Sequence, residues 1–419
     1  MTISLGRVLP LADLADARAR TLSLITDLSD ARLTVPRLET INPLLWEVGH
    51  IAYFAESWTL RHLLGHPSII ANADALYDSA KIPHDDRWTL PLPSRARTMD
   101  FLAQAFEALL AAAPALEDDE QARYFYRLVL HHEDMHAEAL VYARQILSYP
   151  APAYAATPKT GSGALPGDVR ISGGTYSIGA LPGDGFVFDN EKWAHEVELA
   201  SFEIARAPVT VAEYAAFIEG GGYRQAKFWS EEGWAWRKDA DAQRPVYWNE
   251  DEKTRRSFDQ VIALHEHEPV CNVNFYEAQA YCAWAGRRLP SEAEWEVAAT
   301  GAERRRYPWG EQLPDPSLAN LDGTYSGVCD VADYEAGESV TGCRQMLGNV
   351  WEWTSSVFQA YPGFSADPYK EYSEPWFGNH RVLRGGAFTT RSRLISTRWR
   401  NFYRPYRRDI MTGFRTVKR

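Results

Sequence analysis

Hydrophobic residues recur at helical spacing through the first third of the chain. In four segments, apolar side chains three and four residues apart line one side, which predicts a helix for each segment. Helices of this length with short connections are typical of an antiparallel four-helix bundle. The predicted helices cover residues 11–28, 42–64, 94–113 and 118–147.

The connection between the second and third of these helices is long for a bundle. Residues 76–94 contain Pro83, Pro91 and Pro93, which interrupt helical structure. Long structured loops in compact domains are more often functional than idle. We therefore expect this loop to contribute to a binding site.

After residue 168 the helical pattern mostly stops. Short strand-like segments lie at 168–178 and 195–204, helices are predicted at 274–284 and 291–300, and 12 of the 15 tryptophans lie in this part of the chain. Such a domain has few long elements and is held together by large aromatic side chains. The predicted fold class is α+β with two domains: a helical bundle at 1–148, a linker rich in Pro, Ala, Gly and Ser at 149–167, and a second domain at 168–419.

Composition narrows the classes of protein that fit. The formal net charge of −12 disfavours a general nucleic-acid binder, which needs a basic face. Four cysteines without a CxxC pair indicate reduced thiols rather than a disulfide framework. No run approaches the roughly 20 apolar residues that cross a bilayer, and charged residues interrupt the start of the chain. We expect a cytoplasmic protein without a nucleic-acid or membrane partner; its oligomeric state stays open.

The sharpest chemical signal is the segment HHEDMH at 131–136. His132 and His136 are four residues apart and share one helix face with Leu128 and Leu140, so both imidazoles are predicted to point into the bundle. Two buried neutral imidazoles each need a partner, and one metal ion satisfies both. The sequence therefore predicts that His132 and His136 are metal ligands.

A third ligand is expected from another helix of the bundle. His50 is the best candidate because it lies in the middle of an apolar helix, where a lone histidine is costly, and His131 and Glu138 are next in line. Three imidazoles leave coordination positions open, whereas closed structural zinc sites use four ligands, usually with thiolates. Such an open site suits catalysis by zinc, or by Fe(II) with O₂.

The same residues also match the zinc-protease pattern HExxH. That interpretation requires Glu133 as a general base and a third ligand on a helix downstream. About 20 residues past His136 the chain is already in the proline-rich linker, so a protease is the less favoured interpretation.

Longer motifs make the chain recognisable. The Gly49-His50 pair and the later HxxxH in a bundle resemble the DinB-like domain. The second domain contains LPSEAEWE at 289–296, GNVWEWT at 348–354, RGG at 384–386 and GFR at 413–415, and so resembles the formylglycine-generating-enzyme and sulfatase-modifying-factor fold, a C-type-lectin-like domain. Together the two domains resemble the ergothioneine-pathway sulfoxide synthases. That resemblance implies a mononuclear non-haem iron enzyme that uses O₂ to join a thiol to C2 of the hercynine imidazole.

Two other interpretations belong to different classes. A true formylglycine-generating enzyme works through a late cysteine pair, and this chain has no cysteine after Cys343. The second domain is therefore expected to serve as a wall of the active site. The other interpretation is a non-enzymatic metal-binding or lectin-like module, and metal analysis with O₂ uptake in the presence of hercynine separates it from an enzyme.

The resemblance also implies roles for individual residues. The family's iron ligands fall on His50, His132 and His136, with Fe(II) as the cofactor. Its active-site tyrosine, which supplies a proton or hydrogen during O₂ chemistry, maps to Tyr369, with Tyr372 as the competitor. The hercynine-binding residues map to Met135, where many relatives have Gln, to Asn401, and to Phe402 and Tyr403, where relatives have a Trp-Asp pair. Aromatic faces can bind the trimethylammonium group of hercynine by cation–π attraction, and the candidates are Trp351, Phe388, Phe402 and Tyr403.

The long bundle loop decides which second substrate is expected. Relatives that use γ-glutamylcysteine place arginines there, whereas this loop offers Asp85, Asp86, Arg87 and Trp88. Two adjacent carboxylates disfavour a dianionic peptide but can accept hydrogen bonds from sugar hydroxyls, and Trp88 can cover a pyranose ring. The loop resembles the selenoneine synthase branch, which couples a selenosugar to hercynine. The alternative is an ergothioneine-type synthase that uses a thiol such as γ-glutamylcysteine or cysteine, with Arg87 and Lys81 binding its carboxylates.

Overall fold

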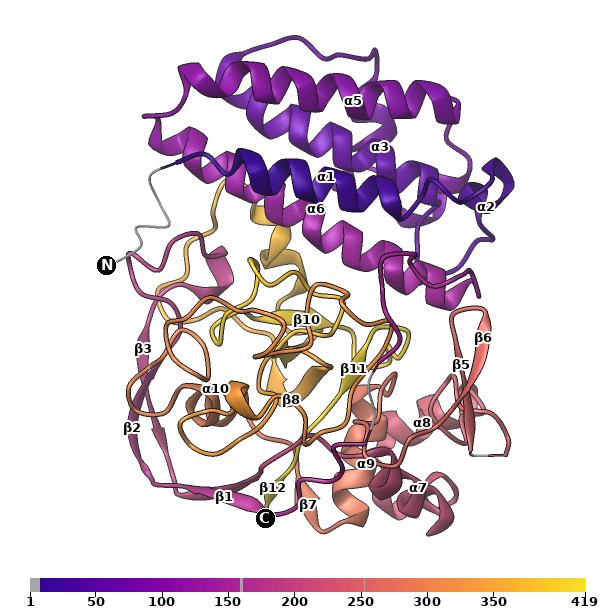
Figure 1. Ribbon diagram of the computed structural model, residues 1–419, viewed down its shortest axis with the longest axis vertical. Helices are drawn as coiled ribbons and strands as arrows, with labels where there is room; N and C mark the ends of the chain where they lie inside the picture. The colour runs from indigo at the N-terminus through magenta and orange to yellow at the C-terminus, as the bar shows by residue number, and fades with distance from the viewer. Residues whose placement is uncertain (1–7, 159–160, 252) are drawn as a thin grey trace. The chain divides into compact units, whose positions relative to one another are not determined.

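The computed structural model describes residues 8–158, 161–251 and 253–419 of the chain (Figure 1). Its internal contacts divide the chain into two compact units, unit 1 at Met1–Leu147 and unit 2 at Ser148–Arg419. Unit 1 is helical, and unit 2 combines short strands, short helices and long loops. The predicted α+β fold with a helical first part is confirmed. Among the described residues, no helix is both long and apolar enough to span a membrane.

Unit 1 is built on four long helices that run side by side (Figure 1). Helix α3 packs against α5 and α6, and α1 packs against α6. The helices and short helical turns of unit 1 are α1 (Leu11–Ser23), α2 (Asp30–Thr34), α3 (Leu44–Ala55), η1 (Glu56–His62), α4 (Ala73–Tyr77), η2 (His84–Trp88), α5 (Arg95–Ala112), η3 (Ala113–Ala115) and α6 (Glu120–Ile146).

Local capping explains where the long helices begin. The Asp119 side chain accepts hydrogen bonds from the backbone N–H groups of Gln121 and Ala122, so α6 starts directly after it. Ser94 caps α5 in the same way, immediately after the proline-rich loop. Helix α3 passes without a break into the π-helical turn η1, so the apolar segment predicted at 42–64 forms one nearly continuous rod.

Unit 2 contains two four-stranded sheets and two two-stranded ones among its described residues. One sheet has the order β1-β4-β12-β7, and the other has the order β10-β9-β8-β11, in which only the β8–β11 pair is parallel. The strands are β1 (Asp168–Ile171), β2 (Gly174–Ile178), β3 (His195–Leu199), β4 (Phe202–Ala205), β5 (Thr254–Ser257), β6 (Gln260–Ala263), β7 (Arg287–Arg288), β8 (Trp351–Val357), β9 (Arg381–Arg384), β10 (Asn401–Tyr403), β11 (Thr412–Gly413) and β12 (Val417–Lys418).

The helices of unit 2 are short, and capping boxes start three of the longer ones. Asn274 and Ser291 are the caps of the two helices that the sequence predicts there. The helices and turns are η4 (Asp189–Glu191), α7 (Val211–Glu219), η5 (Gly222–Arg224), η6 (Ala226–Phe228), α8 (Glu231–Asp239), α9 (Phe275–Trp284), α10 (Glu292–Thr300), η7 (Glu335–Gly337), η8 (Lys370–Tyr372) and η9 (Glu374–Trp376).

Tryptophans and buried ion pairs form the core of unit 2. Trp295, Trp351 and Trp353 have no exposed surface. Arg415 donates from Nε and Nη2 to the two carboxylate oxygens of Glu352, each at 2.7 Å. The large aromatic side chains therefore supply the apolar area that the short strands cannot, as the sequence predicts.

The described residues of the proline- and glycine-rich segment at 149–167 belong to unit 2 and contact its later loops. Ala156 forms an isolated bridge with Tyr325, and the backbone N–H groups of Gly161 and Gly163 donate to Asp330 at 2.8 and 3.0 Å. Residues 159 and 160, which the predicted linker includes, lie outside the described residues.

Candidate metal centre

Three histidines from two helices of unit 1 converge at one point. Helix α3 contributes His50, and α6 contributes His132 and His136, one turn apart. One ring nitrogen of each histidine lies within 4.8 Å of the others, and the Nε2 atoms of His132 and His136 are 3.1 Å apart. The structure thus brings together the three residues that the sequence analysis proposes as metal ligands.

Hydrogen bonds at Nδ1 set the orientation of two of these imidazoles, those of His50 and His136. His50 Nδ1 lies 2.7 Å from the backbone oxygen of Tyr77, a pure acceptor, so Nδ1 carries the proton. His136 Nδ1 lies 2.5 Å from Oε2 of Glu47. In both rings Nε2 is left as the lone-pair nitrogen, which is the arrangement that metal-binding histidines use.

Gly49 explains how the Tyr77 carbonyl comes so close to α3. A Cβ atom at position 49 would lie 2.2 Å from Cε1 of Tyr77, far inside van der Waals contact. The glycine lets the Tyr77 ring pack directly on the helix, and the neighbouring His50 then reaches the Tyr77 backbone oxygen. The Gly-His pair is therefore a packing requirement of this site.

Aromatic rings fix the planes of the imidazoles. The Trp46 ring stacks on His50 at 4.8 Å with an interplanar angle of 8°. The Phe54 ring stacks on His132 at 3.5 Å with an angle of 2°. The rotation of both histidines is thus restricted before any ion binds.

Burial keeps two of the three histidines in the neutral form that binds metals. It lowers the pKa of His50 to about 3, and it lowers the pKa of His132 well below the usual value. Burial alone would raise the pKa of Glu47, but the charge and hydrogen bond of His136, together with Asn42, bring it down to about 2. At neutral pH the site therefore presents the neutral imidazoles of His50 and His132 together with the Glu47 carboxylate.

The geometry fits a divalent transition metal. Two nitrogens about 2.1 Å from one ion, at a right angle to each other, lie about 3 Å apart, which is close to the His132–His136 separation. A direct contact of two lone-pair nitrogens would be repulsive without a proton or a cation between them. Three imidazoles leave positions open for substrates, and imidazole ligands suit zinc, iron and copper alike.

Comparison with known proteins assigns both units to families. Residues 13–143 match the DinB superfamily, and residues 154–419 match the sulfatase-modifying factor enzyme 1-like domain. The hercynine oxygenase of Mycolicibacterium thermoresistibile is 41% identical over 426 residues, which cover 96% of this chain and 93% of that protein. The hercynine oxygenase of Mycobacterium tuberculosis is 40% identical and covers 96% of both chains.

The chain belongs to the hercynine oxygenase family. The formylglycine-generating enzyme of Streptomyces coelicolor is 33% identical, but the match covers only 57% of this chain. Full-length similarity therefore links this protein to the hercynine oxygenase family, while the likeness to formylglycine-generating enzymes is confined to part of the chain.

Glu133 has a structural role in this member of the hercynine oxygenase family. Its two carboxylate oxygens accept hydrogen bonds from Nε and Nη2 of Arg18, at 2.8 and 3.1 Å, and Thr21 donates to Oε1 at 2.9 Å. A carboxylate that is 3% exposed and bound in this way does not act as a general base. The zinc-protease interpretation of HExxH is not supported.

The loop residues differ in their surroundings. Asp85 is exposed and forms an ion pair with Arg37 at 2.6 Å, and Asp86 is exposed beside it on η2. Trp88 donates from Nε1 to the backbone oxygen of Val35 at 3.2 Å. Arg87 turns toward α3 and donates to Asn42. Of these residues, only Arg87 lies among the groups that support the metal ligands.

The remaining candidates in a hercynine oxygenase of this type lie in different settings. Met135 is half-buried on α6, directly before His136. In unit 2, Trp351 has no exposed surface and Phe388 is 4% exposed, so neither ring presents a face to a ligand. Asn401, Phe402 and Tyr403 form β10 and are half-buried, and Phe402 stacks on Phe358 at 4.0 Å. The contact of Asn401, Phe402 and Tyr403 with hercynine stays a prediction, and burial makes Trp351 and Phe388 the weaker candidates.

The two candidate tyrosines flank one short turn. Tyr369 precedes η8 and Tyr372 ends it, with their ring centroids 6.1 Å apart. Tyr372 stacks on Phe188 at 4.2 Å, and burial raises its pKa well above the usual value. Both residues are half-buried, and the stacking on Phe188 restricts the Tyr372 ring.

Several supporting residues were not predicted from the sequence. Glu47 contacts Nδ1 of His136 and accepts a hydrogen bond from Asn42, and Trp46 stacks on His50. A buried glutamate within the otherwise apolar α3 is the one signal that points to such a role, since a buried carboxylate needs a partner. The sequence does not contain an equivalent signal for Asn42.

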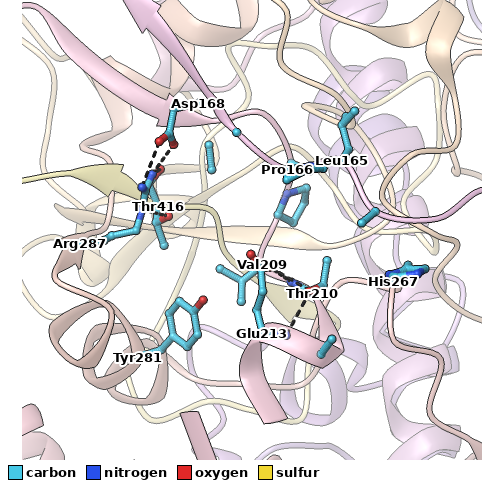
Figure 2. A pocket seen from close by; sticks show the side chains of 16 residues that line it. Leu165, Pro166, Asp168, Val209, Thr210, Glu213, His267, Tyr281, Arg287 and Thr416 are labelled. Atoms are coloured by element: carbon cyan, nitrogen blue, oxygen red, sulfur yellow. Dashed lines mark hydrogen bonds and ion pairs between the residues drawn. The ribbon is translucent and has the colours of Figure 1, made fainter. Parts of the chain in front are cut away.

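Unit 2 also has a pocket of about 300 Å³, which is lined by other residues than the predicted site (Figure 2). Arg287 lies on one side and is bound to Asp168 and Thr416, and the backbone N–H of Thr210, the N-cap of α7, donates to the Glu213 carboxylate. The polar groups of its wall are thus largely occupied with one another. None of the residues predicted from the sequence as site residues lines this pocket.

Proposed function

We propose that this protein is an Fe(II)- and O₂-dependent enzyme that forms a C–Se bond between a selenosugar and C2 of the hercynine imidazole. Membership of the hercynine oxygenase family supports hercynine and O₂ as substrates. The cluster of His50, His132 and His136 supports the metal. The alternative is the coupling of hercynine to a thiol such as γ-glutamylcysteine or cysteine.

The iron would be bound by His50, His132 and His136. When bound, Fe(II) supplies one-electron chemistry with O₂ and a template for two organic substrates. The protein contributes oriented imidazoles: the Tyr77 backbone oxygen orients His50, and Glu47 orients His136. Positioning of reactants in this way removes much of the entropic barrier.

The overall reaction balances with O₂ as the oxidant. A selenol R–SeH, hercynine with its C2–H bond, and O₂ give the hercynyl selenoxide and one molecule of water. The C–Se and Se–O bonds form, the C2–H and Se–H bonds break, and O₂ takes up four electrons. We assign Tyr369 as the proton donor in this reaction and Asn401, Phe402, Tyr403 and Met135 as hercynine contacts.

In the loop at 76–94, Lys81 and Arg87 are both bonded to groups of the protein, and this observation favours a sugar as the second substrate. Lys81 forms an ion pair with Asp78 at 2.7 Å, and Arg87 donates to Asn42 at 2.7 Å. The Asp86 carboxylate, by contrast, forms no hydrogen bond or ion pair with any described residue and is exposed. A loop with committed cations and an available carboxylate suits hydroxyl groups better than a dianionic peptide. Trp88 lies two residues further along the same turn.

Competition between donors tests this proposal. The protein is loaded with Fe(II) without O₂ and then exposed to O₂ with hercynine, a selenosugar and γ-glutamylcysteine at equal concentrations, and the products are identified by mass spectrometry. We expect the selenosugar adduct to dominate. A preference for γ-glutamylcysteine would refute the selenosugar and favour the thiol alternative, and failure to consume hercynine with any donor would refute the proposed reaction.

A variant in the loop sharpens the same test. Asp86→Asn should raise the KM for the selenosugar by roughly 10- to 100-fold and leave the KM for hercynine unchanged, because a charge-assisted hydrogen bond is lost. Glu39→Gln, which changes an exposed carboxylate outside the loop, is the matched control. Equal changes in both KM values for Asp86→Asn would contradict a role in donor binding.

A further inference from the structure

The guanidinium of Arg87 is committed to groups inside unit 1. Its Nη1 donates to Oδ1 of Asn42 at 2.7 Å, and its Nη2 donates to the backbone oxygens of Ser79 and Ile82 at 3.4 and 3.3 Å. The guanidinium carbon also lies 4.1 Å from the centroid of the Trp46 ring. Both terminal nitrogens are therefore in use, and a substrate carboxylate would have to displace Asn42 or a backbone carbonyl.

A chain of hydrogen bonds runs from Arg87 to His136. Because Asn42 accepts from Arg87 through Oδ1, its Nδ2 group is turned toward Glu47 and donates to Oε1 at 2.6 Å. The other oxygen of Glu47 lies 2.5 Å from Nδ1 of His136. Arg87 thus fixes the orientation of the Asn42 amide, and that amide fixes the carboxylate that orients the metal ligand.

A second route runs from Arg87 to His50. The Trp46 ring, which Arg87 contacts, stacks on the His50 imidazole at 4.8 Å and donates from Nε1 to the backbone oxygen of Leu76 at 2.8 Å. The next carbonyl along the chain, that of Tyr77, accepts from His50. His50 is therefore oriented by two groups: the Tyr77 carbonyl at the start of the loop, and the Trp46 ring that Arg87 contacts.

We propose that Arg87 is a positioning residue for the metal ligands His136 and His50, and not a contact to the second substrate. Partners behind a metal-binding histidine typically change metal affinity by about 10- to 100-fold when they are removed. The role rests on the metal site of the proposed function, but it is independent of whether a selenosugar or a thiol is the donor. It also explains why the single arginine of the loop is unavailable to a dianionic donor.

Metal binding by the full-length protein tests this role without any turnover. The Fe(II) dissociation constant is measured by chelator competition, and the Co(II)-substituted protein reports ligand geometry through its visible absorption bands. We expect Arg87→Met to weaken Fe(II) binding by about 10- to 100-fold and to shift the Co(II) bands. Arg97→Met, the same substitution at an exposed arginine of α5, is the matched control and should change neither.

Asn42→Ala separates the positioning role from a general loss of folding. This variant keeps Arg87 over Trp46 but interrupts the chain to Glu47, so it should also weaken Fe(II) binding, and the circular dichroism spectrum of the apo-protein at low temperature checks that the bundle stays folded. Arg87→Lys should recover little of the affinity, because an ammonium group reproduces neither the fork nor the planar contact with Trp46.

The outcomes separate this inference from the proposed function. Wild-type Fe(II) affinity and Co(II) bands in Arg87→Met, with a raised KM for the donor substrate, would overturn the positioning role and make Arg87 a substrate contact. Wild-type metal affinity in Asn42→Ala would overturn the hydrogen-bond route. A wild-type protein that binds neither Fe(II) nor Co(II) would instead refute the metal site on which the proposed function depends.

Discussion

Arg18 and Glu133 form a buried two-point ion pair that joins α1 to α6. Nε and Nη2 of Arg18 lie 2.8 and 3.1 Å from the two oxygens of Glu133, and the side chains are 7% and 3% exposed. Arg18 also donates to the backbone oxygen of Leu102 on α5. The ion pair of this glutamate, which makes the metal motif resemble a protease motif, therefore connects three helices of the bundle.

Breaking this pair should affect stability and not chemistry. Arg18→Met leaves the Glu133 carboxylate buried without its cation, which typically costs about 3–5 kcal/mol. We expect a clearly lower Tm for unit 1, measured by circular dichroism, with Fe(II) binding retained at low temperature. Arg97→Met serves as the control. A Glu133→Gln variant that keeps the wild-type Tm but loses all turnover would contradict the structural role.

Removal of any one ligand should abolish metal retention. In His132→Ala, His136→Ala and His50→Ala, two imidazoles remain, and two are too few to hold Fe(II) at micromolar concentrations. Iron content after desalting, measured with a colorimetric chelator, should fall to background while the helical circular dichroism signal persists. If His50→Ala retains its iron, the third ligand is another residue, with His131 and Glu138 as the next candidates.

A methyl group at position 49 should disturb the same ligand from behind. The Cβ of Gly49→Ala would lie 2.2 Å from Cε1 of Tyr77, so the ring and its backbone must move away from α3. Overpacking of this kind typically costs about 1–3 kcal/mol, and the hydrogen bond from His50 to the Tyr77 carbonyl should weaken. We expect a lower Tm and weaker Fe(II) binding. Unchanged iron affinity in a destabilised variant would show that this carbonyl is not needed to orient His50.

The two tyrosines around η8 should respond differently to loss of their hydroxyl groups. General acids typically contribute about 10²–10⁴-fold to a rate, so Tyr369→Phe should reduce turnover by that order and leave hercynine affinity unchanged. Tyr372→Phe keeps the stacking on Phe188 and should have a small effect. Steady-state kinetics and product analysis of both variants provide the measurement. A large loss in Tyr372→Phe alone would move the assignment by three positions.

Glu191 should make the stability of unit 2 dependent on pH. This side chain is 3% exposed, and burial raises its pKa to about 8 although Arg384 and Arg400 oppose the shift. The folded state keeps the proton, whereas the unfolded chain releases it above its model value of 4.5, so stability falls as pH rises from 4.5 to about 8. The slope approaches about 1.4 kcal/mol per pH unit.

An isosteric amide isolates this contribution. Glu191→Gln mimics the protonated acid and keeps an oxygen for the backbone N–H of Phe188, so its Tm should vary less with pH and should exceed that of the wild type near pH 8. Glu219→Gln, at an exposed position of α7, should follow the wild-type profile. Parallel Tm profiles for Glu191→Gln and the wild type would show that Glu191 is ionised in the folded protein.

Much of the fold follows from local patterns in the sequence. The long helices of unit 1 lie where apolar spacing predicts them, and Ser94, Asp119, Asn274 and Ser291 mark helix starts through capping that involves only the next three residues. The pairing of His132 with His136 is local as well, because residues four apart always share a helix face. The family motifs of the second domain also predict its fold correctly.

Only the tertiary structure shows which distant groups support the site. Glu47 reaches His136 across 89 positions, Arg87 reaches Asn42 across 45, and Arg18 reaches Glu133 across 115. Packing also buries the rings of Trp351 and Phe388, although the sequence analysis counts both among the aromatic faces that could bind the trimethylammonium group. Helix periodicity specifies which face of a helix is apolar, but the partner on that face depends on how the helices pack. The residues that bind a metal could therefore be proposed from the sequence, whereas those that orient its ligands could not.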